Sequence, residues 1–114
     1  MTIMQGDSYP IHFELTIDGT ALKPEMIEEL EVSLGKAEEN ADALRKLYSK
    51  GEVLFDENEN RWYFHPTQEE TLALSEGYYR AVARPRYKNS GKEEVIGVTI
   101  GQIKVERGNS KAVI

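Results

Sequence analysis

One segment, residues 67–80, constrains the fold of this chain more than any other. It reads Thr-Gln-Glu-Glu-Thr-Leu-Ala-Leu-Ser-Glu-Gly-Tyr-Tyr-Arg. Thr67 and Glu70 have the spacing of a capping box, in which a hydroxyl and a carboxylate each accept a backbone N–H bond at a helix start. Gly77 can end such a turn at little steric cost. The segment therefore predicts a short helical turn, at about Thr67–Leu74, that leads into a β-strand.

The end of the same segment has the pattern of a tyrosine corner. Leu74, Gly77 and Tyr79 form a Leu-x-x-Gly-x-Tyr sequence. In a tyrosine corner, a Tyr near the start of a late sandwich strand hydrogen-bonds back to the backbone of the preceding crossover. We therefore expect these three residues to form a structural site in an immunoglobulin-like β-sandwich, a fold that usually binds or assembles.

Alternating polar and apolar residues predict most of the remaining strands. The clearest alternation runs from Tyr9 to Ile17 and indicates a strand with one face exposed to solvent. In the last strand, the apolar positions change from even numbers up to Ile100 to odd numbers from Ile103, so a β-bulge or kink is expected at Gly101. The other expected strands cover about Leu30–Leu34, Leu44–Tyr48, Val53–Phe55, Arg61–Phe64, the residues from Tyr79 onward, and Glu93–Val105.

These patterns together predict an all-β, immunoglobulin-like β-sandwich of about seven strands with one short helical turn. At 114 residues the chain has room for one such domain. We expect the sandwich to cover residues 1–106 and a polar C-terminal tail to cover residues 107–114. The absence of cysteine excludes a disulfide framework and fits synthesis in a reducing compartment. The N-terminus does not resemble a signal peptide, and no apolar run predicts a membrane partner.

The charge distribution argues against nucleic acid as a partner. The net charge is −6, whereas phosphate binding needs a basic surface. Residues 25–59 hold 11 acidic and 4 basic side chains, and residues 80–111 hold 8 basic and 3 acidic ones. Opposite charges in two segments suit either pairing within the domain or contact between subunits.

The sequence lacks the motifs of common catalytic and metal sites. His12 and His65 have no metal-binding spacing, and no Gly-x-Ser-x-Gly nucleophile elbow occurs. The acidic residues Asp56, Glu57 and Glu59 lack the ligand pattern of a calcium loop, so a solvated hairpin tip is expected. A Ser-His-Asp triad assembled by the fold stays open. We predict no catalytic residue, no cofactor and no metal, and hence no enzyme.

One row of side chains has binding character. Arg80, Arg84 and Arg86 are expected on the outer face of one strand, with Tyr87 close by in sequence. Arginine and tyrosine are both enriched at interface hot spots. We predict that these four residues form an assembly interface. The alternative is that the arginines pair with acidic residues on the neighbouring strand.

With these residues laid out, the chain resembles small phage and prophage proteins related to the N-terminal immunoglobulin-like domain of baseplate upper proteins. The resemblance extends over nearly the whole chain. Its residues are Gly6-Asp7-Ser8-Tyr9-Pro10, Gly19-Thr20, Glu31-Val32-Ser33-Leu34, Gly51-Glu52-Val53 and, most strongly, Thr67-x-x-Glu70-Thr71-x-x-Leu74-x-x-Gly77-x-Tyr79. Baseplate upper proteins continue into fibre and trimerisation regions that this sequence lacks, and residues 36–43 look like an insertion. The resemblance therefore implies an accessory or connector role.

The function implied by this resemblance is that of a non-enzymatic, virion-associated structural protein of a tail, baseplate or neck. Such a protein is made in the bacterial cytoplasm and acts through contacts with other phage structural proteins or with itself. We expect self-association through the arginine row and the edge of the last strand, weakened by salt. The alternative is a carbohydrate- or cell-surface-binding module, because sandwich loops and exposed aromatic residues can hold sugars.

Overall fold

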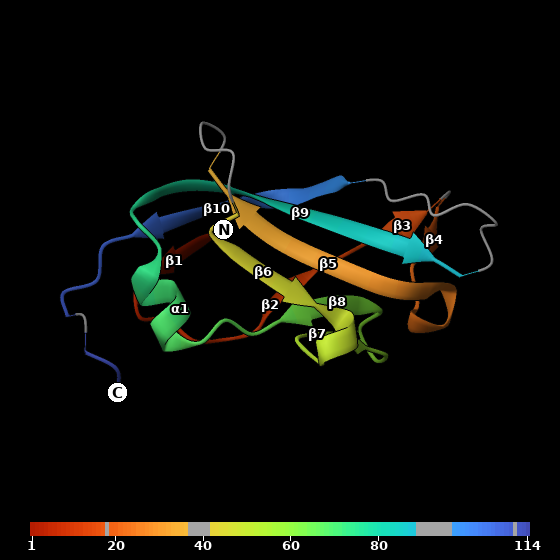
Figure 1. Ribbon diagram of the computed structural model, residues 1–114, viewed down its shortest axis with the longest axis horizontal. Helices are drawn as coiled ribbons and strands as arrows, with labels where there is room; N and C mark the ends of the chain where they lie inside the picture. The colour runs from red at the N-terminus through yellow and green to blue at the C-terminus, as the bar shows by residue number, and fades with distance from the viewer. Residues whose placement is uncertain (18, 37–41, 89–96, 111) are drawn as a thin grey trace.

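The computed structural model describes residues 1–17, 19–36, 42–88, 97–110 and 112–114. Strands account for most of the regular structure in these ranges (Figure 1). No helix among the residues described is long and apolar enough to cross a membrane. The elements are β1 (Thr2–Met4), β2 (Ile11–Phe13), β3 (Thr16–Ile17), β4 (Thr20–Ala21), η1 (Pro24–Met26), β5 (Ile27–Gly35), β6 (Leu44–Leu47), η2 (Tyr48–Lys50), β7 (Val53–Asp56), β8 (Arg61–Phe64), α1 (Gln68–Ala73), β9 (Gly77–Tyr87) and β10 (Val98–Glu106).

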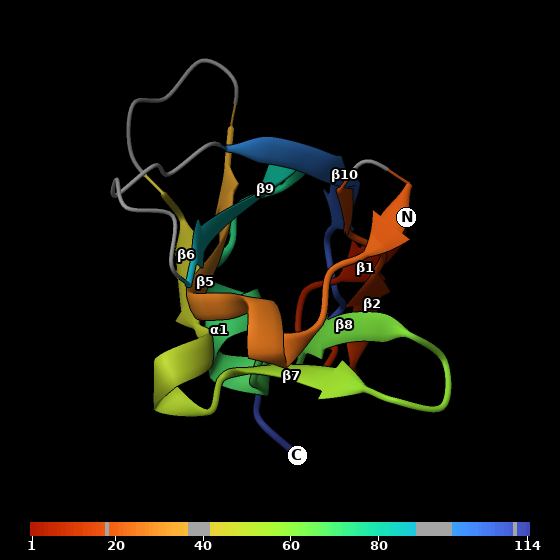
Figure 2. The ribbon, with the colours of Figure 1, turned by 90° about the vertical axis from the view of Figure 1, so that its right-hand side faces the viewer.

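All described strands except β3 and β4, which pair with each other, form the two sheets of an immunoglobulin-like sandwich. One sheet has the order β1-β10-β9-β5-β6, and the other has the order β2-β8-β7. The smaller sheet corresponds to strands B, E and D of an immunoglobulin domain, and β5, β9 and β10 of the larger sheet correspond to strands C, F and G, with β1 and β6 added at its two edges. Viewed along the strands, the curled larger sheet and the smaller sheet surround the interior (Figure 2). The predicted all-β sandwich is confirmed.

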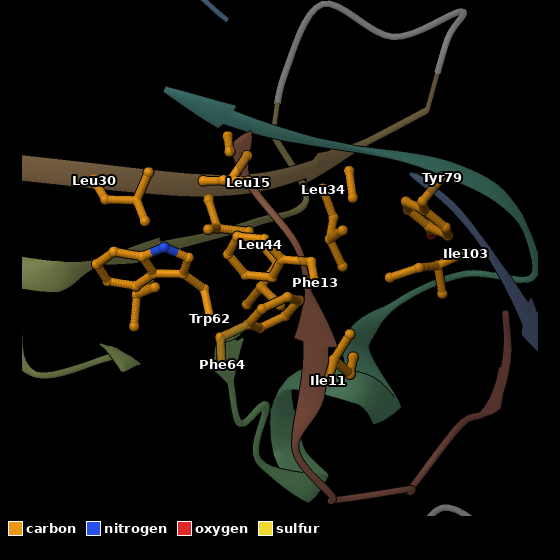
Figure 3. Packing of buried hydrophobic residues seen from close by; sticks show 14 of the residues in the cluster. Ile11, Phe13, Leu15, Leu30, Leu34, Leu44, Trp62, Phe64, Tyr79 and Ile103 are labelled. Atoms are coloured by element: carbon orange, nitrogen blue, oxygen red, sulfur yellow. The ribbon is translucent and has the colours of Figure 1, made fainter. Parts of the chain in front are cut away.

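The core fills the space between the sheets. Trp62 and Phe64 of β8 face Leu30 and Leu34 of β5 across the interior (Figure 3). The Trp62 ring is fully buried, and its Nε1–H donates to the carbonyl of Leu22 at 2.9 Å. This bond satisfies the one polar group of the indole ring inside an apolar interior. Trp62 is therefore a core residue, as its alternation with Phe64 predicts.

The long first strand predicted at Tyr9–Ile17 is wrong in its extent. The inward alternation continues, but the backbone forms two short strands, β2 and β3. β2 pairs with β8 up to the pair Phe13–Trp62, close to where β8 begins at Arg61. β3 pairs instead with β4. The partner strand, and not the alternation, sets where the hydrogen-bonded ladder stops.

The expected irregularity in the last strand is confirmed. The register of β10 against β9 shifts between Thr99 and Gly101, which leaves Ile100 as the extra residue of a β-bulge. The shift lets Ile100 and Ile103 both reach the core despite their numbering. Residues 93–96 of the predicted strand, and most of the residues 36–43 that look like an insertion, lie outside the described residues.

The beginning and end of the chain lie at the same edge. β1 runs parallel to β10 and pairs with it from Thr2–Lys104 to Met4–Glu106. β1 had no signal in the sequence pattern, because three residues are too few for an alternation to stand out. After β10, the amide of Ile114 donates to the Gln68 side chain at 3.1 Å. This contact brings the tail beside α1.

Candidate interaction surface

β9 places the three arginines on the outer face of the larger sheet. Arg80, Arg84 and Arg86 are exposed, whereas Tyr79 and Ala83, which alternate with them, are buried. Successive side chains of a strand point to opposite faces. Because β9 lies between β10 and β5, the arginine row runs along the middle of the sheet and not along an edge.

Two of these arginines form ion pairs within the domain. Arg84 Nη1 lies 3.3 Å from Glu31 Oε1, and Arg86 Nε lies 3.5 Å from Glu28 Oε2. Glu31 also accepts a bond from Arg45 Nε of β6 at 2.6 Å. Each of these arginines is about half exposed, and pairs of this kind contribute little stability. Arg84 and Arg86 therefore have the neighbouring-strand partners that the alternative interpretation expects.

A further acid on β5, Glu29, accepts hydrogen bonds from backbone amides of β5 and η2. Glu29 accepts hydrogen bonds from the amides of Leu30 and Ser49, both at 2.9 Å, and from the Ser49 hydroxyl. Burial alone raises the pKa of the Glu29 carboxyl, but the bonds from Ser49 and Leu30 outweigh it and lower the pKa below its ordinary value. Glu29 thus holds η2 against β5.

Arg80 differs from the other two arginines in its neighbours. In the sheet register it lies opposite Gly35 on β5 and Gln102 on β10, whereas Arg84 lies opposite Glu31. Neither neighbour of Arg80 carries a carboxylate, and no ion pair of Arg80 occurs within the part of the chain that the structure describes. Arg80 therefore lacks the cross-strand acid that Arg84 has.

A hollow of about 670 Å³ lies beside Arg80 on this face. We call it the Arg80 hollow. Its lining includes Lys36, Glu76, Tyr78, Arg80, Gly101 and Gln102. Its volume falls in the range of about 300–1,000 Å³ that is typical of ligand pockets. Gly77 also lines it.

Lys36 is fixed at the wall of the Arg80 hollow. Its Nζ donates to the carbonyl of Glu76 at 2.9 Å and lies 5.4 Å from the centre of the Tyr79 ring. A second lysine, Lys104, lies 5.7 Å from the centre of the ring of the exposed Tyr78. The lining of the hollow therefore contains two cations, Lys36 and Arg80, and the ring of Tyr78. A third cation, Lys104, lies against that ring.

Tyr87 does not belong to the same face as the arginines. It is half buried and packs against the hydrophobic core, on the side of β9 that carries Tyr79. Adjacent residues of a strand point to opposite faces, so nearness to Arg86 in sequence does not bring the two side chains onto one face. The structure brings together the three arginines of the predicted interface and places Tyr87 on the other side.

The residues of the predicted tyrosine corner do meet. The Tyr79 hydroxyl donates to the carbonyl of Ser75 at 2.7 Å, and Leu74 is buried beside the core. Gly77 has φ of +138°, a conformation that side chains disfavour. The capping box is also present, because Thr67 Oγ1 accepts from the Glu70 amide at 3.1 Å and Glu70 Oε1 accepts from the Thr67 amide at 2.9 Å.

The two histidines have separate, local contacts. His65 Nε2 lies 3.0 Å from Ser8 Oγ, and the Ser8 hydroxyl donates to the carbonyl of Pro66 at 2.9 Å. A hydroxyl has one hydrogen, so His65 must donate to Ser8 and does not act as its base in this arrangement. His12 instead stacks on Tyr63, with ring centres 5.2 Å apart. Across the described ranges, no group of three or more His, Cys, Asp or Glu residues could hold a metal ion.

Sequence reasoning missed one buried ion pair. Lys46 lies opposite Val32 of β5 and points inward, with 8% of the residue exposed. Its Nζ lies 2.8 and 2.7 Å from the two carboxylate oxygens of Glu70 and 3.9 Å from Glu52. The alternation of Leu44 and Lys46 on one face of β6 was the available signal. A lysine on an apolar face is unusual unless it is paired.

Comparisons with known proteins identified no relative of the chain. Neither a scan against models of protein families nor searches of curated proteins and of solved structures found a match.

Proposed function

We propose that this protein is a non-enzymatic structural protein of a phage or prophage particle, in the tail, baseplate or neck, and that it acts through protein–protein contacts. The observation that carries the contact role is the open edge of β10. β1 pairs with β10 only at Lys104–Glu106, so over Val98–Gly101 the described strands leave one side of β10 unpaired. An exposed edge is a template for another chain unless it is blocked.

One exposed apolar side chain lies at this open edge. Val98, the first residue of β10, is 45% exposed. The particle itself is inferred from the resemblance of the sequence to baseplate-associated immunoglobulin-like domains.

Mass spectrometry of purified particles from the producing strain tests this function. We expect the protein at a level that is stoichiometric with known particle components. Absence from intact particles would contradict a virion role. Loss of the signal on washing with salt would indicate weak association and not a structural position.

A second candidate, a carbohydrate- or surface-binding module, is favoured by one observation. His12 and Tyr63 stack on the outer face of the smaller sheet, and Leu54, which is opposite Tyr63, is exposed. Aromatic rings on an open sheet face suit the apolar face of a sugar. A glycan array tests this candidate. Clear hits that are lost in Tyr63→Ala would place it ahead of the structural role.

A further inference from the structure

The Arg80 hollow and the tip of the β7–β8 hairpin have complementary charge. The hollow has two cations, Lys36 and Arg80, and one acid, Glu76, in its lining. The hairpin tip, residues 56–60, carries three carboxylates and no basic residue. Opposite charges on two surfaces steer association and fix its geometry.

The hairpin tip is shaped to present these carboxylates. Asp56 Oδ1 accepts bonds from the amides of Asn58 and Glu59 at 3.0 and 3.3 Å, which fixes the turn. Glu59 is mostly exposed and lies 3.6 Å from Arg61. Glu57 is exposed, and no ion pair holds it within the described parts of the chain. The tip therefore projects a carboxylate that has no partner in its own domain.

The two surfaces belong to different layers of the sandwich. The hollow is on the outer face of the larger sheet, between β9 and β10, whereas the hairpin tip extends from the smaller sheet (Figure 2). They can meet only between two molecules. A contact between two different patches is head-to-tail, so it leads to a ring when the rotation closes and to a filament when it does not.

We propose that the Arg80 hollow binds the β7–β8 hairpin tip of a second copy of this chain, with Arg80 and Lys36 receiving the Glu57 carboxylate. This inference rests on the proposed function, because it names a partner for a protein that acts through contacts. Arg80 is suited to the role since neither of its cross-strand neighbours, Gly35 and Gln102, is an acid.

Sedimentation velocity at low and high salt tests the proposal. The wild-type chain should associate at about 0.05 M salt and dissociate at about 1 M, where the screening length falls to about 3 Å. Arg80→Glu, Arg80→Gln and Glu57→Lys should each weaken the association at low salt, by at least about tenfold for the charge reversals. Arg84→Gln and Glu25→Lys are matched controls and should associate like the wild type.

A mixing experiment tests the head-to-tail geometry. Arg80→Glu keeps an intact tip and Glu57→Lys keeps an intact hollow, so an equimolar mixture should associate although each variant alone does not. A mixture that stays monomeric, a monomeric wild type, or controls that weaken association as much as Arg80→Glu would overturn the proposal. Detection in particles together with a monomeric wild type would leave the proposed function standing. Self-association through the hollow without detection in particles would support the hollow–tip contact and contradict the proposed function.

Discussion

Two buried polar side chains, Tyr79 and Lys46, help to attach α1 and the segment after it to the larger sheet. The Tyr79 hydroxyl donates to the Ser75 carbonyl just after the helix. The Lys46 ammonium reaches the Glu70 carboxylate within the helix. Each contact links α1 or the segment that follows it to a strand, so each can be tested by removing a single polar group.

Replacing Tyr79 by Phe should cost about 1 kcal/mol of unfolding free energy, because it removes one hydrogen bond and leaves the Ser75 carbonyl without this donor. Urea denaturation measures this change. Tyr78→Phe is the matched control, since Tyr78 is 57% exposed, and it should change stability little. Equal effects of the two variants would mean that the Tyr79 hydroxyl contributes nothing specific.

Glu70 should make stability depend on acid pH. Burial raises its pKa, but the bonds from Lys46 and Thr67 outweigh this and lower the pKa below 4.5. A carboxyl whose folded pKa is lowered adds stability above its unfolded pKa and loses it as pH falls through the folded pKa. The wild type should therefore be more stable than Glu70→Gln at about pH 7, and the difference should shrink toward about pH 3.

Denaturation of both proteins at the two pH values measures this difference. Glu69→Gln, on the exposed part of the same helix, is the control because it removes a neighbouring carboxylate and leaves the Lys46–Glu70 pair in place. If the difference in unfolding free energy between the wild type and Glu70→Gln is the same at both pH values, the stabilisation comes from the shape of the side chain and not from its charge.

At the scale of elements, local signals predicted the helical turn and the bulge. The capping box needs only Thr67 and Glu70, and the bulge needs only the change of phase around Gly101. Both features depend on residues that are close together in the sequence, so the sequence alone is enough to predict them. The split of Tyr9–Ile17 into β2 and β3 was not predictable in this way, because it depends on where a strand distant in sequence, β8, begins.

The helical turn should depend on its cap. Thr67→Ala removes the oxygen that accepts the Glu70 amide and should cost about 1 kcal/mol, within a usual range of about 0.5–2 kcal/mol. Thr67→Ser keeps the hydroxyl and should stay close to the wild type. Thermal unfolding measures both variants. If the serine variant loses as much as the alanine variant, packing of the threonine methyl group and not the cap stabilises α1.

At the scale of the whole molecule, the sandwich brings together residues that the sequence separates. The fold class was predictable because alternation and the tyrosine corner are local. The candidate site was predictable only in part. The position of the three arginines on one face could be predicted from the alternation. The register, which places acids opposite Arg84 and Arg86 and a glycine opposite Arg80, could not be predicted in this way. The Arg80 hollow needs β9, β10 and Lys36, which follows β5, and no single segment indicates it.

The central claim is that the chain presents to another chain an open edge on β10 and a basic hollow between β9 and β10. Hydrogen–deuterium exchange of residues 98–101, compared with residues 81–84 of the central β9, tests it most directly. In dilute protein at high salt, the edge amides that point away from β9 should exchange much faster than the amides of β9, because that side of β10 is unpaired. At low salt and high concentration, exchange at the edge should slow while that of β9 stays unchanged. Slow exchange of the edge in the dilute protein, or no change on concentration, would contradict the account.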